Sequence, residues 1–263
     1  MTDFTKNGPS GGETIGALLA KNASLHGKDI ARREKERGIW KETTWAEYAE
    51  EVLAFAAGLE KIGVTPGKAV LILGDNRARL YGGMLAISLL GAYAMPAYPG
   101  ATLEELRHFL GEVEIVAAIA EDQEQVDKIL ELKDAGAEGI DHIIYDEARG
   151  LGFYEVEGLL SWDHLIEVGQ HDLNETPGLR EELLSRAKPE DPAIFLHSSG
   201  TTGAPKGIVL SQKNVLAAAR NGHAAGAFGE RSADPPLRMV GAPRAAEVCC
   251  GMLPHGVVGA TTK

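Results

Sequence analysis

One eleven-residue run concentrates the side chains best suited to bind an anion. It holds four hydroxyls, three glycines and one lysine, in the order His197-Ser198-Ser199-Gly200-Thr201-Thr202-Gly203-Ala204-Pro205-Lys206-Gly207. Glycines let the backbone turn so that successive N–H groups converge on an anion. Ser and Thr hydroxyls add donors, and the Lys206 ammonium adds a positive charge that suits phosphate oxygens. The run therefore predicts a phosphate-binding loop rather than an ordinary polar surface loop.

The spacing of this run excludes the two common nucleotide-binding motifs. The P-loop of NTPases requires Gly, four residues, then Gly-Lys followed by Ser or Thr. Counted from Gly200, the place of the second glycine is taken by Pro205, and Lys206 is followed by Gly207. A Gly-x-Gly-x-x-Gly dinucleotide fingerprint is also missing after the early strands. The loop must therefore belong to another class of phosphate site.

The run closely resembles the Ser-Gly-Thr-Thr-Gly-x-Pro-Lys-Gly signature of the adenylate-forming (AMP-binding) enzymes, which include acyl-CoA synthetases and luciferases. Tyr-Thr usually precedes that signature, and His197 and Ser198 take those two places here. Residues 208–214 also resemble the family's continuation, a strand and then the start of a helix. Softer landmarks resemble those of long-chain fatty acyl-CoA ligases: Arg32-Arg33-Glu34-Lys35, Thr43-Thr44-Trp45, Leu73-Gly74-Asp75-Asn76 and Gly91-Ala92-Tyr93.

The resemblance implies ATP-dependent activation of a long-chain fatty acid, first to an acyl-adenylate and then to acyl-CoA. ATP, Mg²⁺ and coenzyme A would be the cofactor and co-substrates. The loop residues would bind the ATP phosphates, and Thr201 and Thr202 would help to place Mg²⁺; the phosphate set is Ser198, Ser199, Gly200, Thr201, Thr202, Gly203 and Lys206. No catalytic nucleophile or base is implied within the chain.

The adenine, ribose and catalytic-lysine motifs of that family have no counterpart in this sequence. We therefore expect an incomplete acyl-CoA synthetase that is inactive alone, with the small C-terminal lid domain absent. The alternative is a non-catalytic nucleotide- or acyl-binding module that acts with a partner. Whether this chain by itself is an enzyme stays open at this point.

Composition narrows the class of protein further. The 263 residues carry a net charge of −12, which argues against a nucleic-acid binder that neutralises phosphates. Cys249 and Cys250 are the only cysteines, and their adjacency fits neither disulfide geometry nor metal-ligand spacing. No apolar run approaches the ~20 residues of a membrane helix, and the N-terminus lacks a signal peptide. We expect a cytoplasmic protein with small-molecule substrates; peripheral membrane association stays open.

Hydrophobic periodicity predicts alternating strands and helices, and hence an α/β fold with a mostly parallel sheet covered by helices on both faces. The family resemblance implies that this fold is the N-terminal part of the large acyl-adenylate synthetase domain. Thr44 with Glu47 and Thr102 with Glu105 predict two capped helix starts. The other expected elements are helices at 14–25, 123–133, 162–168 and 179–187, a strand pair within 30–43, and strands at 69–73, 93–97, 115–120 and 142–145.

The sequence divides into three parts. Residues 1–12 predict a flexible leader, and residues 13–230 a partial AMP-binding (adenylation) domain. Residues 231–263 predict an aberrant or disordered tail, a frame-shifted translation being one origin, because Ser232–Lys263 lacks aromatic residues and contains four prolines. A partial parallel sheet would leave strand edges unpaired, so we expect poor solubility. The acidic residues from Glu121 to Asp127 predict a solvated helix start.

Overall fold

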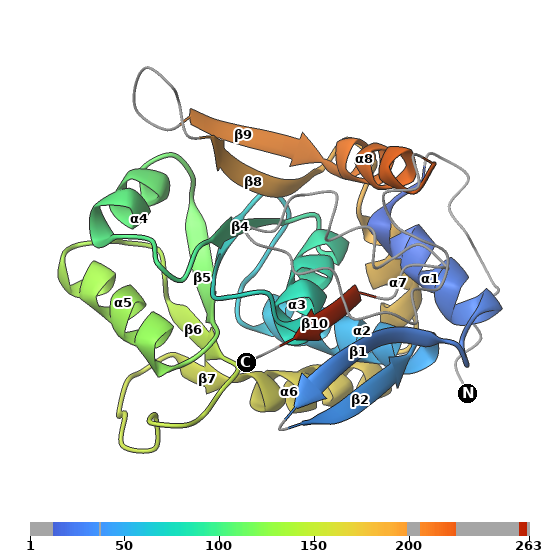
Figure 1. Cartoon of the computed structure of the whole chain (residues 1–263), viewed down its shortest axis with the longest axis horizontal. Helices are drawn as coiled ribbons and strands as arrows, with labels where there is room; N and C mark the ends of the chain where they lie inside the picture. Colours follow the sequence, from blue (N-terminus) through green and yellow to red (C-terminus); the bar gives the residue numbers. More distant parts are fainter. Residues whose placement is uncertain (1–12, 37, 199–205, 225–257, 262–263) are drawn as a thin grey trace.

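The computed structural model describes residues 13–36, 38–198, 206–224 and 258–261 (Figure 1). Its helices are α1 (Ile15–Leu25), α2 (Trp45–Lys61), α3 (Ala78–Leu89), α4 (Leu103–Leu110), α5 (Gln123–Asp134), α6 (Trp162–Glu175), α7 (Leu179–Arg186) and α8 (Gln212–Ala224). Its strands are β1 (Ile30–Glu36), β2 (Ile39–Thr44), β3 (Ala69–Leu73), β4 (Tyr93–Ala97), β5 (Ile115–Ala120), β6 (His142–Tyr145), β7 (Leu159–Ser161), β8 (Pro192–Ser198), β9 (Lys206–Ser211) and β10 (Val258–Thr261).

A seven-stranded sheet forms the centre, in the order β7-β6-β5-β3-β4-β8-β9. All its neighbouring strands pair in parallel except β8 and β9, which are antiparallel. Strand β3 is buried along its whole length, and its side chains alternate between two cores. Val70 and Ile72 face one core, whereas Leu71 and Leu73 face the other. This alternation follows from the two-residue side-chain period of a strand.

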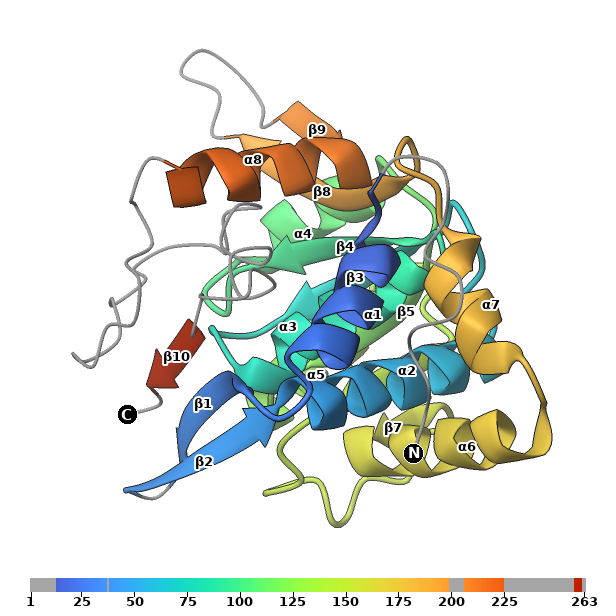
Figure 2. The same cartoon turned by 90° about the vertical axis from the view of Figure 1, so that its right-hand side faces the viewer.

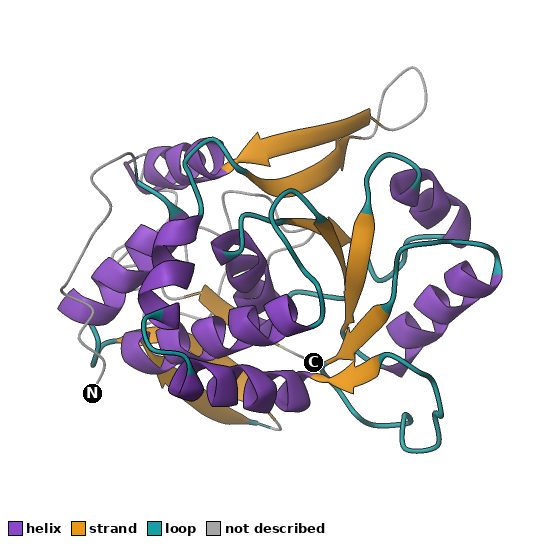
Figure 3. Ribbon diagram, turned by 180° about the vertical axis from the view of Figure 1, so that it is seen from behind, coloured by secondary structure: helices purple, strands orange, loops and turns teal. Residues whose placement is uncertain are grey.

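Helices cover both faces of this sheet, which confirms the predicted fold class. Figures 1 and 3 show α4 and α5 on one side and α1, α2, α3, α6 and α7 on the other. The chain runs from β3 to β4 on one side and then returns across β3 to β5. Right-handed crossovers in opposite directions place their helices on opposite faces, which is the doubly wound arrangement.

The sequence signals for helix starts are confirmed by the cap geometry. Thr44 accepts a hydrogen bond from the Glu47 N–H, and the Glu47 carboxylate accepts from the Thr44 N–H at 2.8 Å. Thr102 and Glu105 form the same reciprocal cap on α4. Each cap satisfies backbone donors that would otherwise lack partners in the first helical turn. The hydrogen bonds to Thr44 lower the pKa of Glu47.

A second, smaller sheet has the order β10-β1-β2. Strands β1 and β2 form the expected antiparallel pair, and β10 lies parallel to β1 with Arg32 opposite Val258. Strand β10 falls within the tail that the sequence predicts to be aberrant. The origin of that tail stays a prediction, and its remaining residues lie outside the described ranges.

Three local expectations were wrong. Helix α6 continues to Glu175 rather than ending near Val168, because Gly169 packs against α2 instead of stopping the helix. Strand β7 is absent from the expected strands, since three residues are too few to give a periodic signal. Glu121 is not solvated but 8% exposed. Its carboxylate accepts a hydrogen bond from Arg77 Nε at 2.6 Å, which compensates the charge where it is buried.

Candidate functional site

The β8–β9 hairpin holds the two ends of the predicted phosphate loop together. Ser198, the last residue of β8, is paired across the hairpin with Lys206, the first residue of β9. Ser199, Gly200, Thr201, Thr202 and Gly203 lie outside the described residues, as do the side chains of Ser198 and Lys206. The structure thus fixes the backbone at both ends of the predicted site.

The hairpin also places the loop at a particular edge of the large sheet. Strand β8 runs parallel to β4, with Ala94 opposite Ile194. The loop therefore begins at the carboxyl ends of the parallel strands, the edge at which open α/β sheets bind ligands.

Gln212, which directly follows β9, connects the hairpin to α1 and α3 through its side-chain amide. It is the first residue of α8 and is fully buried. Its side-chain oxygen accepts from the Ile15 N–H at 3.0 Å, and its side-chain nitrogen donates to the Ser88 carbonyl at 2.9 Å. The amide thereby joins α8 to α1 and α3. A lone glutamine carries no sequence signal for such a role, because its partners lie 197 and 124 residues away.

His197 lies beside the start of the loop in a mostly aromatic environment. Its ring stacks on Phe109 of α4 with centroids 3.5 Å apart, and it meets the Phe195 ring edge-on at 4.8 Å. The side chain is 9% exposed, and its Nε2 lies 3.9 Å from Glu112 Oε2. That nitrogen is buried without a hydrogen-bond partner among the described residues.

Burial lowers the pKa of His197, and the nearby His108 lowers it further, whereas the Glu112 carboxylate opposes both effects. His108 itself lies 3.4 Å from Glu112 through its Nε2. The imidazole of His197 is therefore held in its neutral form near neutral pH. An uncharged aromatic ring thus stands where tyrosine usually precedes the signature that the run resembles.

Gly207 leaves room beside β9 for the side chains of Phe195 on β8 and of Glu112, which follows α4. A Cβ at this position would overlap the Phe195 ring and the Glu112 carboxylate. Only a residue without a side chain leaves room for these two groups, so the last glycine of the run is required by packing as well as by any ligand. The sequence signature alone does not separate these two requirements.

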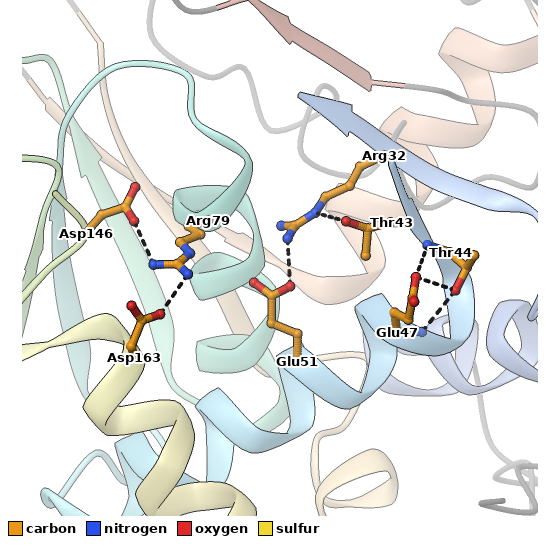
Figure 4. A network of polar contacts seen from close by, with 8 residues as sticks. All are labelled: Arg32, Thr43, Thr44, Glu47, Glu51, Arg79, Asp146 and Asp163. Carbon is orange, nitrogen blue, oxygen red and sulfur yellow. Dashed lines mark hydrogen bonds and ion pairs between the residues drawn. The ribbon is translucent and has the colours of Figure 1, made fainter. Parts of the chain in front are cut away.

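Charged side chains fill the carboxyl edge farther along the sheet. Arg77, the N-cap of α3, pairs with Glu121 at the end of β5, and the Asp75 N–H donates to the same carboxylate. Arg79 binds Asp146 at 3.1 Å and Asp163 at 2.7 Å (Figure 4). Burial raises the pKa of Asp146, an effect that the Arg79 charge opposes. These charged groups pair with one another and hold α3 against the segments that follow β5 and β6.

The softer landmarks of the sequence have structural roles of this kind. Arg32 binds Glu51 at 2.6 Å and Thr43 at 3.3 Å, which ties β1 to α2 (Figure 4). Gly91 has a φ of 70° at the turn between α3 and β4.

In the part of the chain that the structure describes, no group of three His, Cys, Asp or Glu side chains could hold a metal ion. Among the same residues, no helix is long and apolar enough to span a bilayer.

Comparisons with known proteins agree on one family. The model of the AMP-binding enzyme family matches residues 19–262. The chain is 26% identical over 208 residues to the long-chain-fatty-acid–CoA ligase ACSBG2 of Xenopus laevis, an alignment that covers 77% of this chain and 26% of that protein. It is 29% identical over 179 residues to the long-chain-fatty-acid–CoA ligase FadD15 of Mycobacterium tuberculosis, covering 68% of this chain and 28% of that one.

A solved structure matches the fold over nearly the whole chain. The acetoacetyl-CoA synthetase from Streptomyces lividans superposes with a TM-score of 0.71 at 20% identity, covering 94% of this chain and 38% of that one. At this identity the likeness concerns the fold alone. The chain spans about a quarter of the length of the two curated relatives.

Proposed function

Because the chain belongs to the AMP-binding enzyme family, we propose that it contributes the triphosphate-binding part of an acyl-CoA ligase. In such a ligase ATP would activate a long-chain fatty acid as an acyl-adenylate, and coenzyme A would then replace AMP. The observation that supports this most directly is the signature run between β8 and β9, closed by the pairing of Ser198 with Lys206 at the carboxyl edge of the sheet.

The proposed work of this site is positioning and charge neutralisation. The hydroxyls and backbone N–H groups of residues 198–203 would hold the β- and γ-phosphates, and the Lys206 ammonium would neutralise them. Mg²⁺ would add a second positive charge, and Thr201 and Thr202 are the residues proposed to place it. Phosphoryl chemistry gains most of its acceleration from such positioning and electrostatic stabilisation.

Titration calorimetry with Mg·ATP and with inorganic pyrophosphate tests this proposal. We expect saturable binding of both, because the proposed contacts lie with the phosphates rather than with adenine. Lys206→Ala should weaken binding about tenfold or more, the effect of losing one charge-assisted contact to phosphate. Lys213→Ala removes an exposed cation on α8, near the same hairpin, and should leave the affinity unchanged. Equal losses in both variants would show a general charge effect and contradict the proposal.

A second candidate function is a non-catalytic nucleotide- or acyl-binding module that acts with a partner. It rests on the same signature run, whose hydroxyls, glycines and lysine suit phosphate binding without implying a catalytic nucleophile or base. ATP–pyrophosphate exchange in the presence of a long-chain fatty acid separates the two. Exchange that depends on Lys206 supports the ligase, whereas saturable binding without exchange supports the module.

A further inference from the structure

A carboxylate lies beside the base of the predicted phosphate loop. Glu112 follows α4, which Figures 1 and 2 show close to the β8–β9 hairpin. A Cβ at Gly207 would overlap the Glu112 Oε2, so this oxygen lies against the backbone of β9. Gly207 pairs with His197 across the hairpin. The next pair, Ser198 with Lys206, closes the loop. Successive strand residues are about 3.4 Å apart, so the carboxylate lies within several ångströms of the backbone positions at which the loop closes.

Two imidazole rings lie next to this carboxylate. The Glu112 Oε1 is 3.4 Å from His108 Nε2, and the Glu112 Oε2 is 3.9 Å from His197 Nε2. The ring of His197 is fixed by its stacking on Phe109, and the Glu112 N–H donates to the Phe109 carbonyl at 3.2 Å. His197 Nε2 is buried without a hydrogen-bond partner among the described residues. A small rotation of the Glu112 side chain would therefore bring a carboxylate oxygen into hydrogen-bonding distance of a ring that is already held in place.

A bound polyphosphate would change the charge balance of this pair. A carboxylate near an anion site opposes anion binding, because like charges repel over such a distance. A proton on His197 would compensate that carboxylate and would also attract the phosphates. Among the described side chains, Glu112 favours the charged form of His197 and His108 opposes it, whereas the rings of Phe109 and Phe195 carry no charge. Burial favours the neutral ring, so a nearby polyanion is the kind of ligand that shifts the balance toward the imidazolium.

We propose that Glu112 is a positioning residue of the phosphate site, and that it binds the protonated side chain of His197 when a polyphosphate occupies the loop. One proton from water then enters the protein with the ligand, and the imidazolium Nε2–H donates to Glu112 Oε2. No covalent bond changes. The inference rests on the proposed function, because it requires the loop to bind polyphosphate. Linkage is reciprocal, so acid must in turn strengthen polyphosphate binding.

Calorimetric titration with inorganic pyrophosphate at about pH 6 and about pH 8 measures this coupling, because histidine titrates in this range. Pyrophosphate also takes up protons here, so each result is compared with that of His197→Phe, which keeps an aromatic ring beside Phe109. On going from the higher to the lower pH, the unmodified chain should gain about fivefold more affinity than this variant does. At the higher pH the two should bind equally, since neither then carries a charge at position 197.

Glu112→Gln separates a charge effect from a packing effect, because glutamine keeps the shape of the side chain and removes its charge. This variant should bind pyrophosphate about threefold more tightly than the unmodified chain at the higher pH, and it should gain less on acidification. Titration in two buffers that differ in ionisation enthalpy counts the protons, and the uptake should be smaller in both variants than in the unmodified chain. His171→Gln is the matched control, because His171 is exposed on α6; it should behave as the unmodified chain does.

Two results would overturn the proposal. One is an equal change of affinity with pH in His197→Phe and the unmodified chain, and the other is a Glu112→Gln variant that loses affinity equally at both pH values, as a purely structural role predicts. Pyrophosphate binding that depends on Lys206 in either case would leave the proposed phosphate site standing. A chain that binds no pyrophosphate at either pH would overturn both the phosphate site and the role of Glu112.

Discussion

At the scale of single residues, the packing around His197 keeps its ionisable imidazole in the neutral form. Its ring is stacked on Phe109 and nearly enclosed, and burial lowers its pKa. Protonation would place a charge among aromatic rings, where only Glu112 offers partial compensation and His108 adds repulsion. The neighbouring loop would then begin from a charged residue, so the local geometry favours the uncharged ring.

This argument predicts how stability changes with pH. The pKa of His197 is lower in the folded chain than the ordinary histidine value of about 6.5, so the unfolded state takes up this proton first as pH falls. Stability should therefore decline below about pH 6.5 and continue to decline down to the folded pKa. His197→Phe keeps an aromatic ring and should show a weaker decline, measured as urea midpoints across that range. His164→Gln, at an exposed site on α6, should keep the decline of the unmodified chain. Identical pH profiles for His197→Phe and the unmodified chain would contradict the argument.

At the scale of elements, the helices α2 and α6 pack unusually closely because glycine faces glycine at their crossing. A Cβ at Gly169 would overlap the Ala54 carbonyl and approach the Gly58 nitrogen to 2.7 Å. A Cβ at Gly58 would likewise overlap the backbone of Leu165. The close approach lets Phe55 stack on Trp162 with ring centroids 3.6 Å apart. Two small residues therefore determine the position of two long helices.

Gly169→Ala should lower the free energy of unfolding by about 2 kcal/mol or more, because the added methyl must displace backbone rather than a flexible side chain. Gly82→Ala in α3 provides a control of opposite sign. Its Cβ would meet only the Tyr48 ring at 3.6 Å, an ordinary contact, so alanine should stabilise the helix by about 0.5 kcal/mol. Urea unfolding followed by circular dichroism measures both variants. A neutral Gly169→Ala would show that α2 and α6 can separate at little cost.

The same elements show what sequence can and cannot predict here. The caps at Thr44 and Thr102 and the apolar run of β3 are local patterns, and the structure confirms them. The length of α6, the burial of Glu121 and the double hydrogen bond of Gln212 depend on partners far along the chain. A single sequence contains no signal for those pairings. The phosphate-loop residues stay a sequence prediction, because only the strands at either end are described.

At the scale of the whole molecule, the two edges of the large sheet differ in their exposure to other chains. Strand β7 has three residues and leads directly into α6, so it offers little backbone for pairing. Strand β9 has six residues, and its Ile208 and Val209 are 45% and 54% exposed. An exposed, apolar edge strand of this length can add a strand from another chain.

We therefore expect the purified chain to associate with itself as its concentration rises, with β9 as the contact. Val209→Lys should keep it monomeric, because a charge on an edge strand would have to be desolvated on pairing. Phe153→Lys distinguishes pairing at the strand edge from nonspecific hydrophobic association. Phe153 is 98% exposed, but it lies in a loop between β6 and β7. Size-exclusion chromatography with light scattering measures the mass of each variant. If Phe153→Lys suppressed association as strongly as Val209→Lys did, exposed apolar area in general, rather than the β9 edge, would be the cause. If the unmodified chain stayed monomeric at every concentration, the β9 edge would not be available for pairing, which would contradict the prediction.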